Sequence, residues 1–336
     1  MRYVICLVWI MGLWSCNGKS SLPDVSNIEV QLSTERFDKS LFSMDTVNIL
    51  EGIDALNRQH PSFTNIYFAR ILNADPRWSE DTTREYIASF LRFYKPVYDT
   101  AQKVFKDFKP QEKELKRSLQ FLKYHFPEYK APNKVITYIG PLDGYGDILD
   151  EDAFLVGLHH HLGSTYSMYE SMLVLETYPT YISRRFTPET IVVNCMNNVL
   201  NDMFPEQLED KTLIVQMVEK GKKLYALQQL IPEKDEHYLI GYTQKQLKEC
   251  YENEKNIWAL FTQNNYLQST DFNINKNYVG ESPRTMELGE ASPGNIGSFA
   301  GWQIVKKYVS KKGNISLKEL MQTPAETIYT VSKYKP

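Results

Sequence analysis

Apolar residues recur at three- and four-residue steps along much of the chain, a spacing typical of helices that bury one face. In the first half of the chain prolines separate five such stretches, because proline lacks the amide hydrogen that a helix interior uses. The predicted helices there span residues 46–59, 63–72, 83–93, 97–108 and 111–126. The break between the third and the fourth is placed at Pro96. This half is therefore predicted to be mainly helical.

A second pattern, short runs of β-branched and aromatic residues, appears near the middle of the chain. Residues 134–139 and 153–158 have this composition, and glycines and a proline punctuate the segment between them. These runs predict two strands joined by a turn-rich loop. The alternating residues 28–32 predict a further strand near the start of the fold.

Helical spacing returns in the second half of the chain. The predicted helices are residues 178–185, 188–203, 211–230 and 243–261. Pro188 suits the first turn of its helix, and Thr187 is the candidate cap. The helix over 188–203 is predicted to be a core element, because Ile191, Cys195 and Val199 repeat at helical spacing beside a second apolar stripe that includes Met196.

The last part of the chain begins irregularly. Residues 268–295 are polar and without a clear period, and an amphipathic helix is predicted over 299–309. Two short helices follow, with Ser316 and Thr323 as their candidate caps. Taken together, the pattern predicts an α+β fold that is predominantly helical and has a small sheet.

The N-terminal residues carry the pattern of an export signal. A positive start is followed by an apolar run over 3–14, too short for a spanning helix, which needs roughly 20 residues. The run ends in Leu13-Trp14-Ser15-Cys16, which fits a lipobox. We predict that residues 1–15 are a signal peptide and that Cys16 is lipidated. Two acyl chains on one cysteine would anchor the protein stably, whereas one would be marginal. The alternative is a plain secretory signal with an incidental cysteine.

The mature chain is expected to have a simple organisation. Residues 16–26 are the acylated N-terminus and a polar tether, and residues 27–336 form a single periplasmic domain. No later apolar stretch approaches the length of a membrane span. The residues after Cys16 lack an acidic cluster of the kind that sends lipoproteins to the cell surface, so we expect a periplasm-facing protein held to the membrane by its lipid.

Composition narrows the choice of partners. With 42% hydrophobic and 24% charged residues and a formal net charge of −3, the chain is ordinary globular material without a basic patch for a polyanion. We therefore expect no nucleic-acid partner. Cys195 and Cys250 remain after export, in a compartment that permits disulfides. They form either a bridge or, as their helical surroundings favour, two buried thiols.

Three consecutive histidines, residues 159–161, are the clearest candidates for metal ligands. If the strand from Ala153 continues, His159 and His161 share one face, so at most two imidazoles converge. Acidic residues at 147 and 150–152 lie just upstream and offer oxygen ligands. Zinc or another divalent ion would suit such a set. We favour the interpretation that these histidines are structural or face the solvent.

Other chemical templates are weak. A nucleophile elbow, a Walker loop and a dinucleotide fingerprint are all lacking in the sequence. The turn containing Gly294 and Gly297 precedes a helix, so its backbone amides are a possible ligand or anion cradle. Its structural reading, which we favour, is a sharp turn that lets Trp302 reach the core; Trp258 is also expected to be at least partly buried.

Several segments spread over the chain carry a further pattern. They are residues 33–38, 154–163, 178–186, 221–225, 240–242, 290–297, 301–305 and 332–336. In this order, and above all through Glu290-Ala-Ser-Pro-Gly-Asn-Ile-Gly297, they resemble the gliding-motility lipoprotein GldB family. The resemblance implies an outer-membrane-associated periplasmic lipoprotein. In gliding bacteria it links such a protein to the motility machinery that is coupled to type IX secretion.

That family in turn weakly resembles zinc metallopeptidases, which implies a zincin-like scaffold. A zincin needs two histidines four residues apart on one helix and a glutamate beside the first. In the corresponding helix this chain has Asn194-Cys195-Met196-Asn197-Asn198. Carboxamides are neither good zinc ligands nor general bases, so these side chains are expected only to form hydrogen bonds. Glu219 remains near the place of a third ligand, but one carboxylate does not hold zinc.

Two functions from different classes follow. The first, which we favour, is a non-catalytic envelope component without a cofactor that docks onto partner proteins. The second is a metal- or ligand-binding, hydrolase-like lipoprotein. Its polar set would be His159, His161 and Glu219, in a cleft near the two strands.

Overall fold

The two strands predicted near the middle of the chain form the centre of a small mixed sheet. The computed structural model describes residues 22–336, so the predicted signal peptide and Cys16 lie outside the described residues. β2 (Lys134–Tyr138) and β4 (Ala153–Gly157) pair in parallel. β1 (Ser33–Glu35) pairs in parallel with β2, and β3 (Ile148–Leu149) pairs antiparallel with β4. The order is β1-β2-β4-β3. Every residue of β4 is buried, as expected of a strand covered on both faces.

The strand predicted over residues 28–32 is wrong, because pairing with β2 begins only at Ser33. The backbone of residues 28 and 29 is held instead by side chains of α5 (Lys109–His125). Gln120 donates to the Ile28 carbonyl at 3.0 Å, and Lys123 donates to that of Glu29 at 3.2 Å. Val25, within the expected tether, is fully buried, so the chain already packs against the fold at that residue.

The N-terminal helices occur largely where they were predicted. They are α1 (Phe37–Phe42), α2 (Ile49–Gln59), α3 (Thr64–Ile66), the π-helical η1 (Tyr67–Ile71), α4 (Glu80–Val104) and α5. The predicted break at Pro96 is wrong, since α4 continues through it. Pro96 and Arg92 are exposed, so water can satisfy the Arg92 carbonyl that the proline leaves unpaired, while buried Tyr94 and Val97 hold the helix on both sides.

The middle of the chain forms short elements that lead into one long helix. They are η2 (Leu158–His160), η3 (Ser167–Glu170), α6 (Met172–Thr177), α7 (Thr180–Ser183), η4 (Pro188–Thr190) and α8 (Ile191–Met203). The strand β4 ends before the histidines, and His159 and His160 lie in the 3₁₀ turn that begins at Leu158. Thr187 does not cap with its side chain, because its hydroxyl is buried and has no hydrogen-bonding partner within residues 22–336.

The C-terminal part is entirely helical apart from its connections. Its elements are α9 (Leu213–Leu230), α10 (Glu236–Ile240), α11 (Gln244–Glu252), α12 (Glu254–Gln263), η5 (Tyr266–Gln268), α13 (Phe272–Val279), η6 (Met286–Leu288), α14 (Ile296–Lys312), α15 (Leu317–Gln322) and α16 (Ala325–Ser332). The segment expected to be irregular contains α13, capped by Asp271. Ser316 caps α15 as predicted, whereas Thr323 ends α15 and does not cap the last helix.

Two glycines bring the helices α9 and α14 into backbone contact. A Cβ on Gly301 would lie 1.7 Å from the Met217 carbonyl oxygen, and one on Gly221 would lie 2.3 Å from the Gly301 carbonyl carbon. The predicted amphipathic character of α14 is wrong, because from Ile296 to Val305 the helix is buried on all sides. Trp302 is fully buried within it, as expected, and Trp258 is partly buried.

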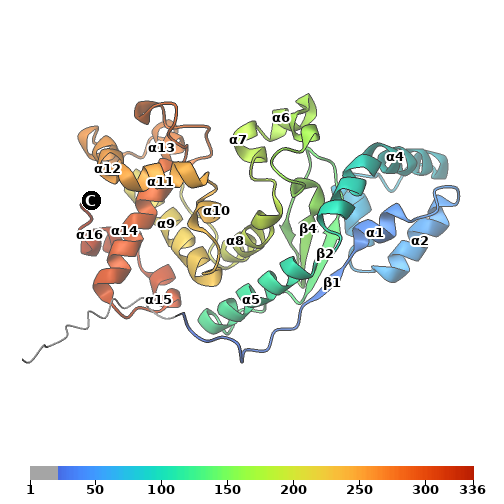
Figure 1. Cartoon of the computed structure of the whole chain (residues 1–336), viewed down its shortest axis with the longest axis horizontal. Coiled ribbons are helices and arrows are strands. Elements are labelled where there is room, and N and C mark those ends of the chain that lie inside the picture. Colours follow the sequence, from blue (N-terminus) through green and yellow to red (C-terminus); the bar gives the residue numbers. More distant parts are fainter. Residues whose placement is uncertain (1–21) are drawn as a thin grey trace, which may run out of the picture.

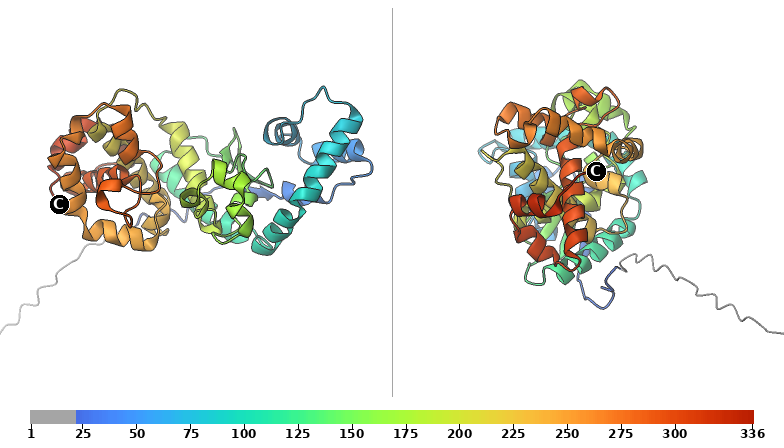
Figure 2. Two further views of the ribbon diagram at one scale, coloured as in Figure 1. Left: turned by 90° about the horizontal axis from the view of Figure 1, so that it is seen from above. Right: turned by 90° about the vertical axis from the view of Figure 1, so that its left-hand side faces the viewer.

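The elements are arranged along one axis. Figure 1 shows the sheet and the helices α1, α2 and α4 at one end and the helices α9–α16 at the other, with α5 and α8 between them. Both groups remain separate when the molecule is seen from above in Figure 2. The predominantly helical α+β fold is thus confirmed. Among residues 22–336 no helix has both the length and the apolar character needed to cross a bilayer.

The two remaining cysteines are separate thiols. Cys195 on α8 and Cys250 on α11 are both free and buried, so the buried-thiol interpretation is confirmed and the bridge is wrong. Burial raises the pKa of both, that of Cys250 to about 12. Both therefore act as small apolar groups of the core.

Candidate functional site

The helix α8 separates an apolar face from a carboxamide face, as predicted. Ile191, Cys195, Met196 and Val199 are buried in the core. The asparagines at 194, 197, 198 and 201 lie on the other side, and two of them bond to one aspartate. Asn194 donates to the Asp147 carboxylate at 2.8 Å, and Asn198 donates to the Asp147 carbonyl at 3.0 Å. The carboxamides therefore hold the residue that precedes β3.

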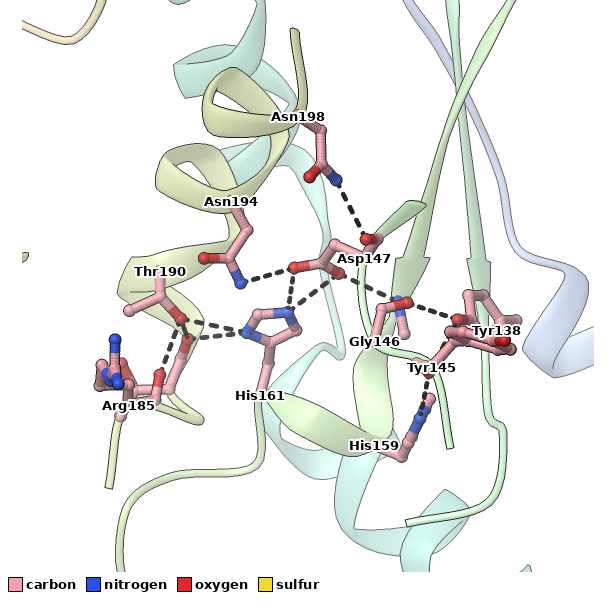
Figure 3. Close-up of polar contacts among 12 residues, drawn as sticks. Tyr138, Tyr145, Gly146, Asp147, His159, His161, Arg185, Thr190, Asn194 and Asn198 are labelled. Atoms are coloured by element: carbon pink, nitrogen blue, oxygen red, sulfur yellow. Dashed lines mark hydrogen bonds and ion pairs between the residues drawn. The ribbon is translucent and has the colours of Figure 1, made fainter. Parts of the chain in front are cut away.

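Asp147 forms a buried ion pair with His161, shown in Figure 3. The two side chains are 2% and 1% exposed, and Nε2 of His161 lies 2.8 Å from Oδ2 of Asp147. The backbone amide of Gly157 donates to Oδ1 of the same carboxylate at 3.1 Å. These three hydrogen-bonding partners of the carboxylate are thus all N–H donors, from β4, from α8 and from the imidazole.

His161 has an acceptor at each ring nitrogen. Nδ1 lies 2.9 Å from the Thr187 carbonyl, opposite the contact of Nε2 with Asp147. Burial is the largest influence on this group and opposes its charge, but the Asp147 carboxylate and the Thr187 carbonyl outweigh it and raise the pKa of His161. Because both nitrogens face acceptors, the ring donates from both and is an imidazolium. The hydroxyl of Thr190 lies 3.3 Å from Nδ1.

The other two histidines hold the loop between β2 and β3. Nδ1 of His159 accepts from the Gly140 amide at 3.0 Å, and its Nε2 donates to the Tyr145 carbonyl at 3.0 Å. Nε2 of His160 donates to the Leu142 carbonyl at 2.9 Å. Burial lowers the pKa of both rings, that of His160 to about 4. These two rings are neutral, and all three histidines fasten the turn-rich loop to the sheet.

Glu219, the third residue of the hydrolase-like alternative, lies elsewhere. It is on α9 near Pro324 and Ala325 at the start of α16, and its Oε1 is 2.9 Å from Nζ of Lys222. The structure therefore does not bring His159, His161 and Glu219 together. Within residues 22–336, no group of three histidine, cysteine, aspartate or glutamate side chains is placed to hold a metal ion.

A cavity of about 460 Å³ opens on the carboxamide face of α8, and we call it the α8 cavity. It lies between α7 and α8 on one side and α9, α10 and the start of α14 on the other. Its lining comprises Ile182, Arg185, Phe186, Thr190, Val193, Asn194, Asn197, Asn201, Glu206, Lys220, Lys223, Leu224, Tyr238, Leu239, Ile240, Gly241, Glu281, Asn295 and Ser298. Asn194 and Thr190 connect this cavity to the buried pair of Asp147 and His161.

The charged groups of the cavity contact one another, three cationic side chains with two glutamates. Arg185, after α7, binds Glu281 through both terminal nitrogens, at 3.2 and 2.6 Å, and so links the two sides of the cavity. Lys220 and Lys223 share Glu206 at 2.8 and 3.3 Å. Burial opposes the charge of Glu206, but the two lysines outweigh it and lower the pKa of its carboxyl. Burial also lowers the pKa of Lys223.

The glycine turn before α14 is packed against its neighbours. A Cβ on Gly294 would lie 2.0 Å from the Ser282 carbonyl oxygen, and one on Gly297 would lie 2.9 Å from that of Tyr278. Tyr242 donates to the Gly294 carbonyl at 2.9 Å. The residues that reach the α8 cavity from this region are Asn295 and Ser298. The two glycines therefore let the backbone approach its neighbours closely, and the ligand or anion cradle stays a prediction.

Sequence reasoning found part of this arrangement. It identified the asparagines and the three histidines, and it noted Asp147 only as one of several acidic residues upstream. It missed Arg185 and Glu281, which are 96 residues apart, and the shared contact of Glu206 with two lysines. No local pattern marks such pairs, because residue types common on any surface form them.

Fold and site together define a helical α+β protein whose buried polar pair is sealed and whose neighbouring cavity is open and lined with carboxamides. The chain belongs to the GldB family: the model described as "Gliding motility protein GldB" matches residues 18–336. It is thus a gliding-motility-related lipoprotein that is associated with a membrane of the cell envelope. No curated protein and no solved structure matches the chain. The zincin-like scaffold therefore stays a prediction.

Proposed function

We propose that this chain is a non-catalytic, lipid-anchored component of the gliding apparatus. It faces the periplasm from the outer membrane, and it acts by docking onto envelope proteins of the motility machinery that is coupled to type IX secretion. Its lipid restricts it to a membrane plane, and its folded part provides the binding surface.

The observation that carries the proposal is the state of the polar groups beside α8. The carboxylate of Asp147 accepts from three groups, and both nitrogens of His161 donate. A carboxylate and an imidazole fixed in this way are not available to activate water or to ligate a metal. The face of α8 that borders the α8 cavity offers carboxamides, which bind by hydrogen bonds and do not transfer protons near neutral pH.

Absence of catalysis is testable on the purified mature lipoprotein in detergent micelles. A mixture of fluorogenic peptides is incubated with the protein, with and without a chelator, and cleavage is followed by fluorescence and mass spectrometry. We expect no cleavage above that of an Asp147→Asn variant. Cleavage that the chelator abolishes would contradict the proposal.

Docking is tested separately by crosslinking in intact cells, followed by solubilisation of the outer membrane and purification of the chain. We expect defined envelope proteins to be crosslinked to the lipidated chain and to be reduced in a Cys16→Ser variant. A chain that remains uncrosslinked at natural abundance would count against a docking role.

A further inference from the structure

The α8 cavity contains hydrogen-bonding groups that the chain itself does not use. Nδ2 of Asn194 and Oδ1 of Asn201 are occupied, by Asp147 and by Lys223, which leaves Oδ1 of Asn194 and Nδ2 of Asn201. The carboxamide of Asn197 borders the cavity and has no hydrogen-bonding partner among residues 22–336. Nε of Arg185 is buried and finds no partner in the described part of the chain. The cavity thus presents donors and acceptors together.

The spacing of these groups matches an extended polypeptide backbone. Residues 194, 197 and 201 lie on one face of α8 and span about 10 Å, at a rise of 1.5 Å per residue. About three residues of an extended chain cover the same length. In an extended chain the N–H and the C=O of one residue point to the same side, so a single carboxamide can pair with both at the same time. Asn197 can do so, whereas Asn194 offers its oxygen and Asn201 offers its N–H₂ group.

The rest of the lining suits side chains of a peptide. Its apolar members are mainly aliphatic: Ile182, Val193, Leu224, Leu239 and Ile240. A volume of about 460 Å³ lies within the usual range of ligand sites, about 300–1,000 Å³. Of the segments that carry the family resemblance, four contribute lining residues: 178–186, 221–225, 240–242 and 290–297.

We infer that the α8 cavity binds a short extended segment of a partner polypeptide, with Asn194, Asn197 and Asn201 pairing with its backbone. The inference rests on the proposed docking function and assigns the docking site to the α8 cavity. An anion fits the cavity less well, because it would compete with the carboxylates that the cationic side chains already contact: Arg185 contacts Glu281, and Lys220 and Lys223 share Glu206. A sugar fits less well, because its rings stack on aromatic faces and this lining is mainly aliphatic.

The test uses the mature lipoprotein in detergent micelles and a phage-displayed library of short random peptides. Selected peptides are synthesised with a fluorescent label, and their affinity is measured by anisotropy. We expect Asn197→Trp, which fills the cavity, to weaken binding about tenfold or more. Its matched control is Asn273→Trp, at an exposed asparagine of α13 outside the cavity, which should leave the affinity unchanged.

Two further measurements keep the result decisive. Asn197→Ala removes only the carboxamide and should weaken binding about two- to tenfold even if the tryptophan variant fails to fold. Replacing single peptide bonds of the bound peptide by esters should weaken binding where the cavity accepts a backbone N–H. Failure to select any peptide would overturn the inference. So would an unchanged affinity of Asn197→Trp and Asn197→Ala, relative to the unaltered chain, when both variants have native circular dichroism.

Failure of this inference is distinguishable from failure of the proposed function. If envelope proteins crosslink equally to Asn197→Trp and to the unaltered chain, docking stands and its place is elsewhere on the surface. If the selected peptides are bound and then cut, as mass spectrometry of the peptide would reveal, the non-catalytic function fails.

Discussion

Three adjacent histidines carry different charges in this molecule because their partners differ. His161 faces the Asp147 carboxylate and is cationic, whereas His159 and His160 face backbone groups and are neutral. Burial lowers the pKa of the neutral pair and is outweighed only at His161. A run of identical side chains thus gives no information about charge until the partner of each ring is known.

The neutral histidines predict how stability depends on pH. The unfolded chain protonates His160 near pH 6.5, but the folded chain does so only near its pKa of about 4. The stability that depends on a neutral His160 is therefore fully present above about pH 6.5 and is lost as the pH falls toward 4. The free energy of unfolding in urea should therefore differ less between wild type and His160→Gln at pH 4 than at pH 6.5, by about 3 kcal/mol.

A control for this experiment is Phe186→Leu. The Phe186 ring stacks on His160 at 4.3 Å between centroids, so the variant loses packing but keeps the titrating group. Its unfolding free energy should lie below that of the wild type by a similar amount at every pH. Equal narrowing in both variants would show that packing, and not titration of His160, causes the effect.

The buried ion pair predicts a large effect of Asp147→Asn. An asparagine there places an N–H₂ group among donors from Gly157, His161 and Asn194, and it removes the charge that balances the imidazolium. Breaking a buried pair costs about 3–5 kcal/mol, which chemical denaturation measures. Glu151→Gln, at an exposed carboxylate a few residues away, should change stability by less than about 0.5 kcal/mol. A similar loss in both variants would argue against a special role for the pair.

Among the helices, α8 is the element whose role was clearest from its spacing. Met196 is fully buried in it, so Met196→Ala should destabilise the fold by about 2–5 kcal/mol in denaturant unfolding, through lost burial and a cavity. Met286→Ala, at a methionine that is 69% exposed, is the matched control and should change stability by less than about 0.5 kcal/mol. A loss below 1 kcal/mol at Met196 would mean that this face is not tightly packed.

The crossing of α9 and α14 predicts an effect of Gly301→Ala. The added methyl group would meet the Met217 carbonyl oxygen at 1.7 Å, so the two helices must separate. We expect destabilisation of about 1–3 kcal/mol or more, measured as a lower Tm. Ser310→Ala, on the exposed side of the same helix, should be neutral or slightly stabilising because alanine favours the helix. A Tm unchanged by Gly301→Ala would contradict this close approach.

The local pattern predicted whether a segment is helix or strand, but it did not predict where each element begins and ends. The run of prolines predicted breaks correctly between most N-terminal helices, but α4 continues through Pro96 because its neighbours Tyr94 and Val97 are buried. Residues 28–32 alternate like a strand, yet side chains of α5 bind their backbone first. In both cases contacts distant in sequence outweighed a correct local preference.

At the scale of the whole molecule, the proposed lipid anchor at Cys16 predicts how the protein is attached to the membrane. Because no helix among residues 22–336 can cross a bilayer, Cys16→Ser should move the protein from the membrane fraction to the soluble fraction, as fractionation and immunoblotting would measure. Ser20→Ala, in the same N-terminal segment, should stay in the membrane fraction. Membrane retention of Cys16→Ser would contradict the lipid anchor. The orientation is checked by protease treatment of intact cells, which should leave the chain intact.

Patterns that act over a few residues determined much about this protein without a structure. Helical spacing gave the dominant class, β-rich runs gave the two central strands, and ordered short segments gave the GldB family. The same spacing showed that α8 buries one face and turns its asparagines to the other. These features depend on backbone geometry and side-chain periodicity, which neighbouring residues fix.

Only the tertiary structure decided what the polar residues do. It paired Asp147 with His161, joined Arg185 to Glu281 across 96 residues, and placed Glu219 away from the histidines. The energy of a charged or hydrogen-bonding group depends on its burial and on its partners. Packing of distant segments sets both, so the sequence names these groups while the fold determines their state.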